Sequence, residues 1–161
     1  MTYNSKRYIM SMVTGVLSLA AYIIYVLTSK APAQEDIMGW ARLMLAFIGI
    51  AVGLQVIVQI AYHVGYAIRV SLKEQDKDGE KTKKIINSAM VVDERDKLIN
   101  LKSLRVGYTC AGIGLIVALF TLAGGVPYVI ALHIIVGAGA AGALIEGCVA
   151  VFFHERGVRN G

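Results

Sequence analysis

Residues 69–105 read RVSLKEQDKDGEKTKKIINSAMVVDERDKLINLKSLR. This stretch holds ten of the sixteen lysine and arginine residues of the chain, and long apolar runs lie on both sides of it. A chain of 161 residues that is 57% hydrophobic has more apolar side chains than a soluble domain of this length buries around one core. The pattern therefore predicts an all-α, polytopic integral membrane protein in which the charged stretch separates two transmembrane hairpins.

Four apolar runs are long enough to cross about 30 Å of hydrocarbon at 1.5 Å per residue. They cover residues 8–27, about 38–68, 106–123 and about 127–153. The second and fourth runs are longer than a bilayer needs, and we expect them to tilt or to project into the cytoplasm. The first run is too long for the h-region of a signal peptide and contains Tyr22 and Tyr25, so we expect it to be retained. The predicted domain organisation is a first transmembrane hairpin at 1–68, a charged loop with an amphipathic helix at 69–105, and a second hairpin with a short tail at 106–161.

The distribution of basic residues predicts the orientation, because short loops rich in Lys and Arg stay on the cytoplasmic side. Lys6 and Arg7 precede the first run, the central loop holds ten basic residues, and Arg156 follows the fourth run. The opposite side has only Lys30, with Arg42 just inside the second run. We expect a multi-pass protein of the plasma membrane with both termini in the cytoplasm. We expect its basic residues to contact membrane lipids. We expect no nucleic-acid partner, because the sequence shows no aromatic platform on which bases could stack.

The central loop changes character along its length. Residues 73–84 mix Lys, Glu, Asp and Gly with almost no apolar residue, which is typical of a solvated linker. Apolar residues recur from Ile85 onward, and later at three- and four-residue spacings in Leu98, Ile99, Leu101 and Leu104. This periodicity predicts an amphipathic helix that lies along the inner membrane surface or continues into the third span.

A dense charged cluster stands at the start of this helix, in Asp93, Glu94, Arg95 and Asp96. Asp93 suits the N-cap position, and acidic residues in the first turn favour the positive end of the helix dipole. Capping explains the alternation with Arg95 less well. The cluster is therefore also a candidate contact for a cytoplasmic protein partner, for a second protomer of a homodimer, or for the inner ends of the chain's own spans.

A resemblance to a known family begins at this cluster, in Asp93-Glu94-Arg95-Asp96-Lys97-Leu98-Ile99, with Lys102 and Tyr108 following. The segment resembles a family of small bacterial and archaeal predicted membrane proteins in which Asp-Glu-Arg-Asp/Glu-x-x-Ile-x-x-Lys/Arg precedes a transmembrane hairpin. The last span of that family ends in an aromatic-basic-Gly sequence, often Tyr-Arg-Arg-Gly, to which Phe152-Phe153-His154-Glu155-Arg156-Gly157 is similar. The family is functionally uncharacterised. The resemblance implies a prokaryotic plasma-membrane protein with four spans, and it implies no reaction.

Polar residues inside the spans form a second candidate site. Gln55, Gln59 and His63 follow at four-residue spacings and so share one face of the second span. Glu146 lies about seven residues from the inner end of the fourth span, or roughly 10 Å inside, at a depth similar to that of His63. An ionisable residue at such a depth usually faces a cavity or a partner, and a His63–Glu146 pair is possible.

Three interpretations of these polar residues remain open. The first is interhelical hydrogen bonding by Gln and His. The second is a ligand-binding or proton-coupled site in which Glu146 titrates with His63 as its partner. The third is haem or a metal, for which His63 and His154 are the one conceivable inner pair. We expect no cofactor and no metal.

Small residues recur at the G-x-x-x-G spacing on two spans. Gly49 and Gly53 lie on the second span, and Gly139, Ala143 and Gly147 lie on the fourth. Strips of this kind allow close approach of helix backbones in lipid, so they predict packing of the second span against the fourth. A homodimer built on the fourth span is the alternative.

Motifs of catalysis are missing from the sequence. The chain has no H-E-x-x-H, no P-loop, no G-x-S-x-G and no C-x-x-C. Cys110 and Cys148 are expected to be packing residues. Trp40 lies near the outer boundary of the second span and is expected to be an interfacial anchor. We therefore predict a non-enzymatic regulatory or protein-interaction module of the plasma membrane. The alternative is a small proton-coupled transporter or resistance protein with a site between the second and fourth spans.

Overall fold

Four long helices make up the fold in a computed structural model that describes residues 3–74 and 94–156. They are α1 (Tyr3–Tyr25), which continues into a π-helical segment η1 (Val26–Lys30), then α2 (Ile37–Glu74), α4 (Glu94–Ala123) and α5 (Tyr128–Arg156). Within these two ranges the structure contains no strand. Each helix is long and apolar enough to cross a membrane. The prediction of an all-α, four-span, multi-pass membrane protein is confirmed.

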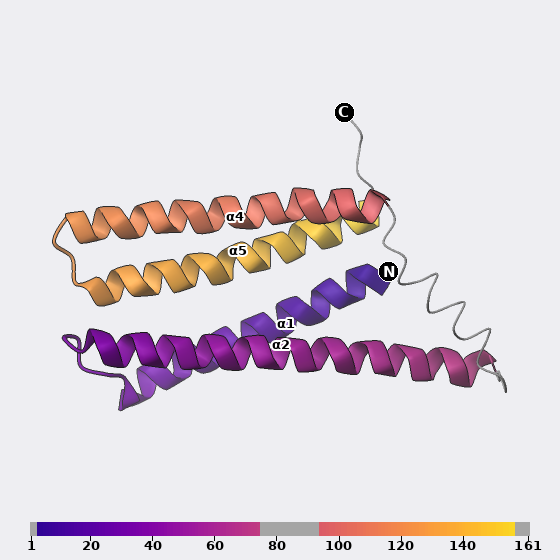
Figure 1. Ribbon diagram of the computed structural model, residues 1–161, viewed down its shortest axis with the longest axis horizontal. Helices are drawn as coiled ribbons and strands as arrows, with labels where there is room; N and C mark the ends of the chain where they lie inside the picture. The colour runs from indigo at the N-terminus through magenta and orange to yellow at the C-terminus, as the bar shows by residue number, and fades with distance from the viewer. Residues whose placement is uncertain (1–2, 75–93, 157–161) are drawn as a thin grey trace.

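The helices form two hairpins whose short connections lie at the same end (Figure 1). We name this the turn end, after the connections at residues 31–36 and 124–127. At the opposite end, the charged end, α1 and α4 begin and α2 and α5 finish (Figure 1). Helix α5 packs along α4 and also against α1, while α2 packs mainly on α1 and touches α5 only lightly. Helix α5 is therefore central to the bundle.

Glycines bring α4 and α5 close together. A Cβ atom added to Gly142 of α5 would lie 2.7 Å from the carbonyl oxygen of Gly107 on α4. A Cβ atom on Gly114 of α4 would likewise collide with the Cβ atom of Ala138 on α5. Because lipid gives helices no hydrophobic drive to associate, such backbone proximity supplies the van der Waals contact that joins them.

The predicted packing of the second span against the fourth is wrong. Cβ atoms on Gly49 and Gly53 of α2 would meet nothing within 4 Å, and both glycines are exposed. Gly139 of α5 also has open space beside it, whereas a Cβ atom on Gly147 would lie 2.5 Å from Cγ of Met12 on α1. The G-x-x-x-G spacing identified residues without side-chain bulk, but the spacing alone does not choose the partner helix.

An aromatic core closes the turn end, where Tyr22, Trp40, Met44 and Val129 are buried. The Trp40 indole Nε1 donates to the carbonyl of Ala33 at 3.1 Å, and its ring lies 4.9 Å from that of His133. Trp40 is only 6% exposed and packs inside the bundle, which differs from the interfacial anchor expected from the sequence. The indole N–H of Trp40 donates to a backbone carbonyl within the bundle and is therefore not available to lipid headgroups.

His133 ties this core to α1. Its Nδ1 lies 2.7 Å from the carbonyl oxygen of Val129, which can only accept a hydrogen bond, so Nδ1 carries a proton. In the neutral ring Nε2 is then an acceptor, and the Tyr22 hydroxyl donates to it at 3.0 Å. The hydrogen-bonded chain fixes α1 against α5 at the turn end.

Helix lengths match the expectation for the second span, and for the third they agree with one of the two alternatives that the sequence left open. Helix α2 has 38 residues, which corresponds to about 57 Å and exceeds the hydrocarbon thickness. Helix α4 is continuous from Glu94 to Ala123, so the juxtamembrane helix predicted before Arg105 is the first part of the third span. Large apolar side chains point outward, among them Leu17, Leu45 and Phe120, as lipid-facing residues do.

Candidate functional site

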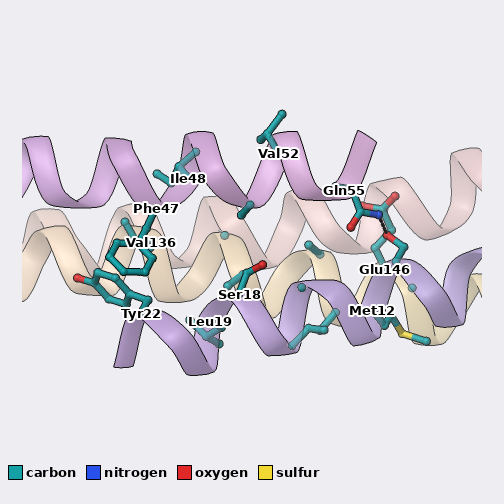
Figure 2. Close-up of a pocket in the computed structure, with 18 of the residues that line it drawn as sticks. Met12, Ser18, Leu19, Tyr22, Phe47, Ile48, Val52, Gln55, Val136 and Glu146 are labelled. Carbon is teal, nitrogen blue, oxygen red and sulfur yellow. Dashed lines mark hydrogen bonds between the residues drawn. The ribbon is translucent and has the colours of Figure 1, made fainter. Parts of the chain in front are cut away.

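A cavity of about 670 Å³ lies between α1, α2 and α5 (Figure 2). One face of each helix lines it, and on α1 the lining residues recur every three or four positions from Tyr8 to Tyr22. Fourteen residues of helix rise by about 21 Å, so the cavity follows α1 through much of the thickness of a bilayer.

Small residues create this space. Gly15 on α1, Ala51 on α2, and Gly139, Ala140 and Ala143 on α5 all line the cavity. A Cβ atom at Gly15 or at Gly139 would find no heavy atom within 4 Å. The small residues of α5 leave unfilled the space between α5 and α2, which touch only lightly, so a hollow lies where the sequence predicted a packed interface.

Polar side chains gather at the part of the cavity nearer the charged end. Gln55 of α2 and Glu146 of α5 lie at the same end of it, and Tyr22 and Phe47 lie at the other (Figure 2). The Gln55 amide Nε2 donates a hydrogen bond to the Ser11 hydroxyl of α1. This bond leaves the carbonyl oxygen of Gln55 available as an acceptor, because the amide group engages Ser11 through its nitrogen.

Glu146 is the one lining residue with a formal charge. Its carboxylate makes no hydrogen bond and no ion pair with any residue in the described part of the chain. One carboxylate oxygen lies 2.8 Å from the position that a Cβ atom of Gly107 would take. The missing side chain at Gly107 therefore makes room for Glu146 between α4 and the cavity.

Gln59 and His63 do not line the cavity, although both are partly buried. They follow Gln55 by one and two helical turns toward the charged end, beyond the level of Glu146. Of the His63–Glu146 pair considered from the sequence, only Glu146 lines the cavity, and the pairing itself stays a prediction. The structure thus brings together two of the four predicted intramembrane residues, Gln55 and Glu146.

Residues of the first helix were missed from the sequence. Tyr8, Ser11, Ser18 and Tyr22 all line the cavity. Their spacings of three, seven and four residues place them on one face of α1, and every one carries a hydroxyl group. A search for the polar face of each apolar helix would have found them.

A second polar group, the charged-end cluster, consists of Asn4, Tyr8, Asp96, Asn100 and His154. The Asn4 amide donates to one carboxylate oxygen of Asp96 at 3.0 Å, and His154 Nδ1 lies 3.5 Å from the other. The Tyr8 hydroxyl donates to Asn100 at 3.1 Å. Because these residues come from α1, α4 and α5, the cluster joins three helices.

The Asp96 carboxylate therefore contacts other helices of the same chain, at their charged end. This was one of the three roles predicted for the charged cluster at 93–96. Glu94 and Arg95 are exposed in the first turn of α4. Asp93, predicted as the N-cap, lies outside the described residues, as does the segment from Ile85 to Val92, so both of these expectations stay predictions.

Replacing Asp96 with alanine tests the charged-end cluster. The variant loses the acceptor of Asn4 and the partner of His154, and we expect the free energy of unfolding to fall by about 1–3 kcal/mol. A double-mutant cycle with Asn4→Ala, read by SDS titration of the protein in mixed micelles, should give a coupling energy of about 0.5 kcal/mol or more. Lys97→Ala, one residue away and exposed, is the control and should change stability by less than about 0.5 kcal/mol. Additive effects of Asn4→Ala and Asp96→Ala would show that the two side chains do not interact.

No group of three or more His, Cys, Asp or Glu side chains that could hold a metal ion occurs in residues 3–74 and 94–156. Cys110 and Cys148 are both free thiols, and the Cys148 Sγ lies 3.7 Å from the Met12 Sδ.

Comparisons with protein-family models, with curated proteins and with solved structures give no match for this chain. The cavity and the charged-end cluster must therefore be interpreted from their own chemistry.

Proposed function

We propose that this protein is a small membrane transporter or resistance protein whose substrate occupies the cavity between α1, α2 and α5. The observation that carries the proposal is the open cavity with the unpaired carboxylate of Glu146 in its wall. The cavity opens to the surroundings of the bundle, since Ile48, Val52 and Val56 in its wall are partly exposed, so a ligand could enter it from outside. Small-molecule sites typically have volumes of about 300–1,000 Å³, and 670 Å³ lies within that range.

The arrangement of the cavity walls also favours a substrate site. Ligand pockets combine mostly apolar walls with a few convergent polar groups, and here Ser11, Gln55 and Glu146 converge on a cavity otherwise lined mainly by apolar side chains. The aromatic core packs at the turn end, where the Tyr22 and Phe47 rings lie 5.3 Å apart edge to face. These two rings line the cavity at the end opposite Glu146.

We further propose that the charged end faces the cytoplasm of a prokaryotic cell and that the membrane is the plasma membrane. Lys6, Arg7, Arg69 and Lys97 belong to the charged end, whereas Arg42 lies near the turn end. This bias supports the orientation through the positive-inside rule. The resemblance that starts at Asp93 supports the prokaryotic origin.

Regulation through protein contacts is the second candidate function. Glu94, Arg95 and Lys97 are exposed in the first turn of α4, where a partner protein or a second copy of the chain could reach them. Asp96 contributes less to such a surface, because its carboxylate already holds α1 and α5. The cavity favours transport over this alternative, because contacts at the charged end give no reason for an open hollow between α1, α2 and α5.

A neutral fluorescent probe tests the proposed function. N-phenyl-1-naphthylamine is apolar, uncharged at neutral pH, and brighter in apolar surroundings. We expect saturable binding of one probe per protein in lipid nanodiscs, after subtraction of the signal from empty nanodiscs. A signal that rises only linearly, as it does in empty discs, would mean that the cavity is not a binding site and would remove the proposal.

A further inference from the structure

We propose that the substrate is an amphipathic amine, with one cationic nitrogen at Glu146 and an apolar body that extends toward Tyr22 and Phe47. The inference rests on the proposed function, because it concerns the same cavity. It adds the charge, the polarity and the orientation of the occupant.

The charge of the cavity wall gives the first argument. Glu146 is an acidic residue among lining residues that include no lysine and no arginine. A carboxylate inside a bundle is costly unless a positive group or hydrogen-bond donors compensate it, and the Tyr8 hydroxyl, which interacts electrostatically with Glu146, donates its hydrogen bond to Asn100 instead. A cationic ligand provides that compensation. An anionic ligand would add a like charge, and a doubly charged cation would find only one carboxylate.

Hydrogen-bonding capacity gives the second argument. At the Glu146 end the carboxylate offers only acceptors, and Gln55 keeps its carbonyl oxygen as an acceptor together with one amide N–H, because its bond to Ser11 uses only the other N–H. A protonated amine carries N–H donors and can bond to both residues. A charge-assisted bond of this kind is about twice as strong as a neutral one.

The length and polarity of the cavity give the third argument. From Glu146 toward the turn end the walls consist mainly of apolar and aromatic side chains, such as Leu19, Phe47, Ile48, Val52 and Val136 (Figure 2). A small hydrophilic amine would leave this surface uncovered. A ligand with an apolar body would bury it, at about 25 cal/mol per Å² of apolar area.

Three naphthalene compounds of similar size provide the test: 1-naphthylmethylamine, cationic at neutral pH, 1-naphthylmethanol, which is neutral, and 1-naphthoate, which is anionic. Displacement of N-phenyl-1-naphthylamine from wild-type protein in nanodiscs should be about tenfold or more stronger for the amine than for the alcohol. The carboxylate should be the weakest of the three. These rankings need no variant, so they do not depend on the folding of a mutant.

Two substitutions then assign the preference to one carboxylate. Glu146→Gln should bring the amine-to-alcohol affinity ratio to about one. Glu155→Gln removes the same charge from an exposed position near the end of α5, outside the cavity, and should keep the wild-type ratio. An equal affinity of wild-type protein for amine and alcohol, or a preference that survives in Glu146→Gln, would overturn the inference. Saturable binding of the neutral probe would in that case leave the proposed function standing, whereas a failure of that probe to bind would remove both.

Discussion

Replacing Gly142 with leucine is expected to separate α4 from α5 and to lower the free energy of unfolding by about 3 kcal/mol or more. The first new carbon would already lie 2.7 Å from a backbone oxygen of Gly107, and the rest of the side chain would extend into the same interface. A backbone oxygen in the middle of a helix cannot move without its helix. The helices must therefore move apart, and the close contacts along the most extensive interface of the bundle are lost.

Gly137→Leu is the matched control for this substitution. Gly137 lies on the same helix, is exposed, and has no heavy atom within 4 Å of an added Cβ atom. Leucine favours a helix over glycine by roughly 1 kcal/mol or less, so this variant should be as stable as the wild type or slightly more stable. SDS titration of both variants measures the difference. Equal stability of Gly142→Leu and Gly137→Leu would contradict the packing of α4 on α5 described above.

The number of helices and their approximate positions could be predicted from the sequence, because apolar run length is a local property that the bilayer thickness dictates. The sequence left open whether the residues before Arg105 form a separate surface helix or continue into the third span. Residues before Arg105 have a charged composition that suggests a separate surface helix, yet no glycine or proline interrupts the chain between Glu94 and Val106. The segment before Arg105 therefore joins the third span as one helix, since extending an existing helix costs little free energy.

The partners of the small residues could not be predicted. Gly49 and Gly53 have the same spacing as Gly139 and Ala143, but the first two face open space and the last two line the cavity. A glycine strip permits the close approach of another helix without requiring it. Which helix packs against the strip depends on the angles at which all four helices cross. The residues that do join α4 to α5, Gly107 and Gly114 with Gly142, are conspicuous only when the helices are placed side by side.

The candidate site was predicted in part. Glu146 was recognisable because an acidic residue within an apolar run is rare, and Gln55 because polar residues share a helix face. His63 was included on the same argument, but helix α2 continues past the cavity, so the face extends further than the site. Ser11 was missed because a hydroxyl in a membrane helix often bonds to its own backbone and gives no signal of a site.

The same small residues that leave the cavity open also allow it to be filled. Gly139→Phe places a large apolar side chain in the cavity, at a position where a Cβ atom meets nothing within 4 Å, so the fold should tolerate it. Gly137→Phe places the same side chain two residues earlier on α5, at an exposed position outside the cavity. The two variants therefore share chemistry and helix but differ in whether the cavity is occupied.

Binding of N-phenyl-1-naphthylamine to these two variants is the most direct test of the claim that the space between α1, α2 and α5 is the ligand site. We predict that Gly139→Phe weakens binding by about tenfold or more, equivalent to about 1.4 kcal/mol, and that Gly137→Phe leaves the affinity within about twofold of wild type. The variants should unfold at similar SDS concentrations, which separates loss of the site from loss of the fold. Equal affinity of the two variants for the probe would contradict the account.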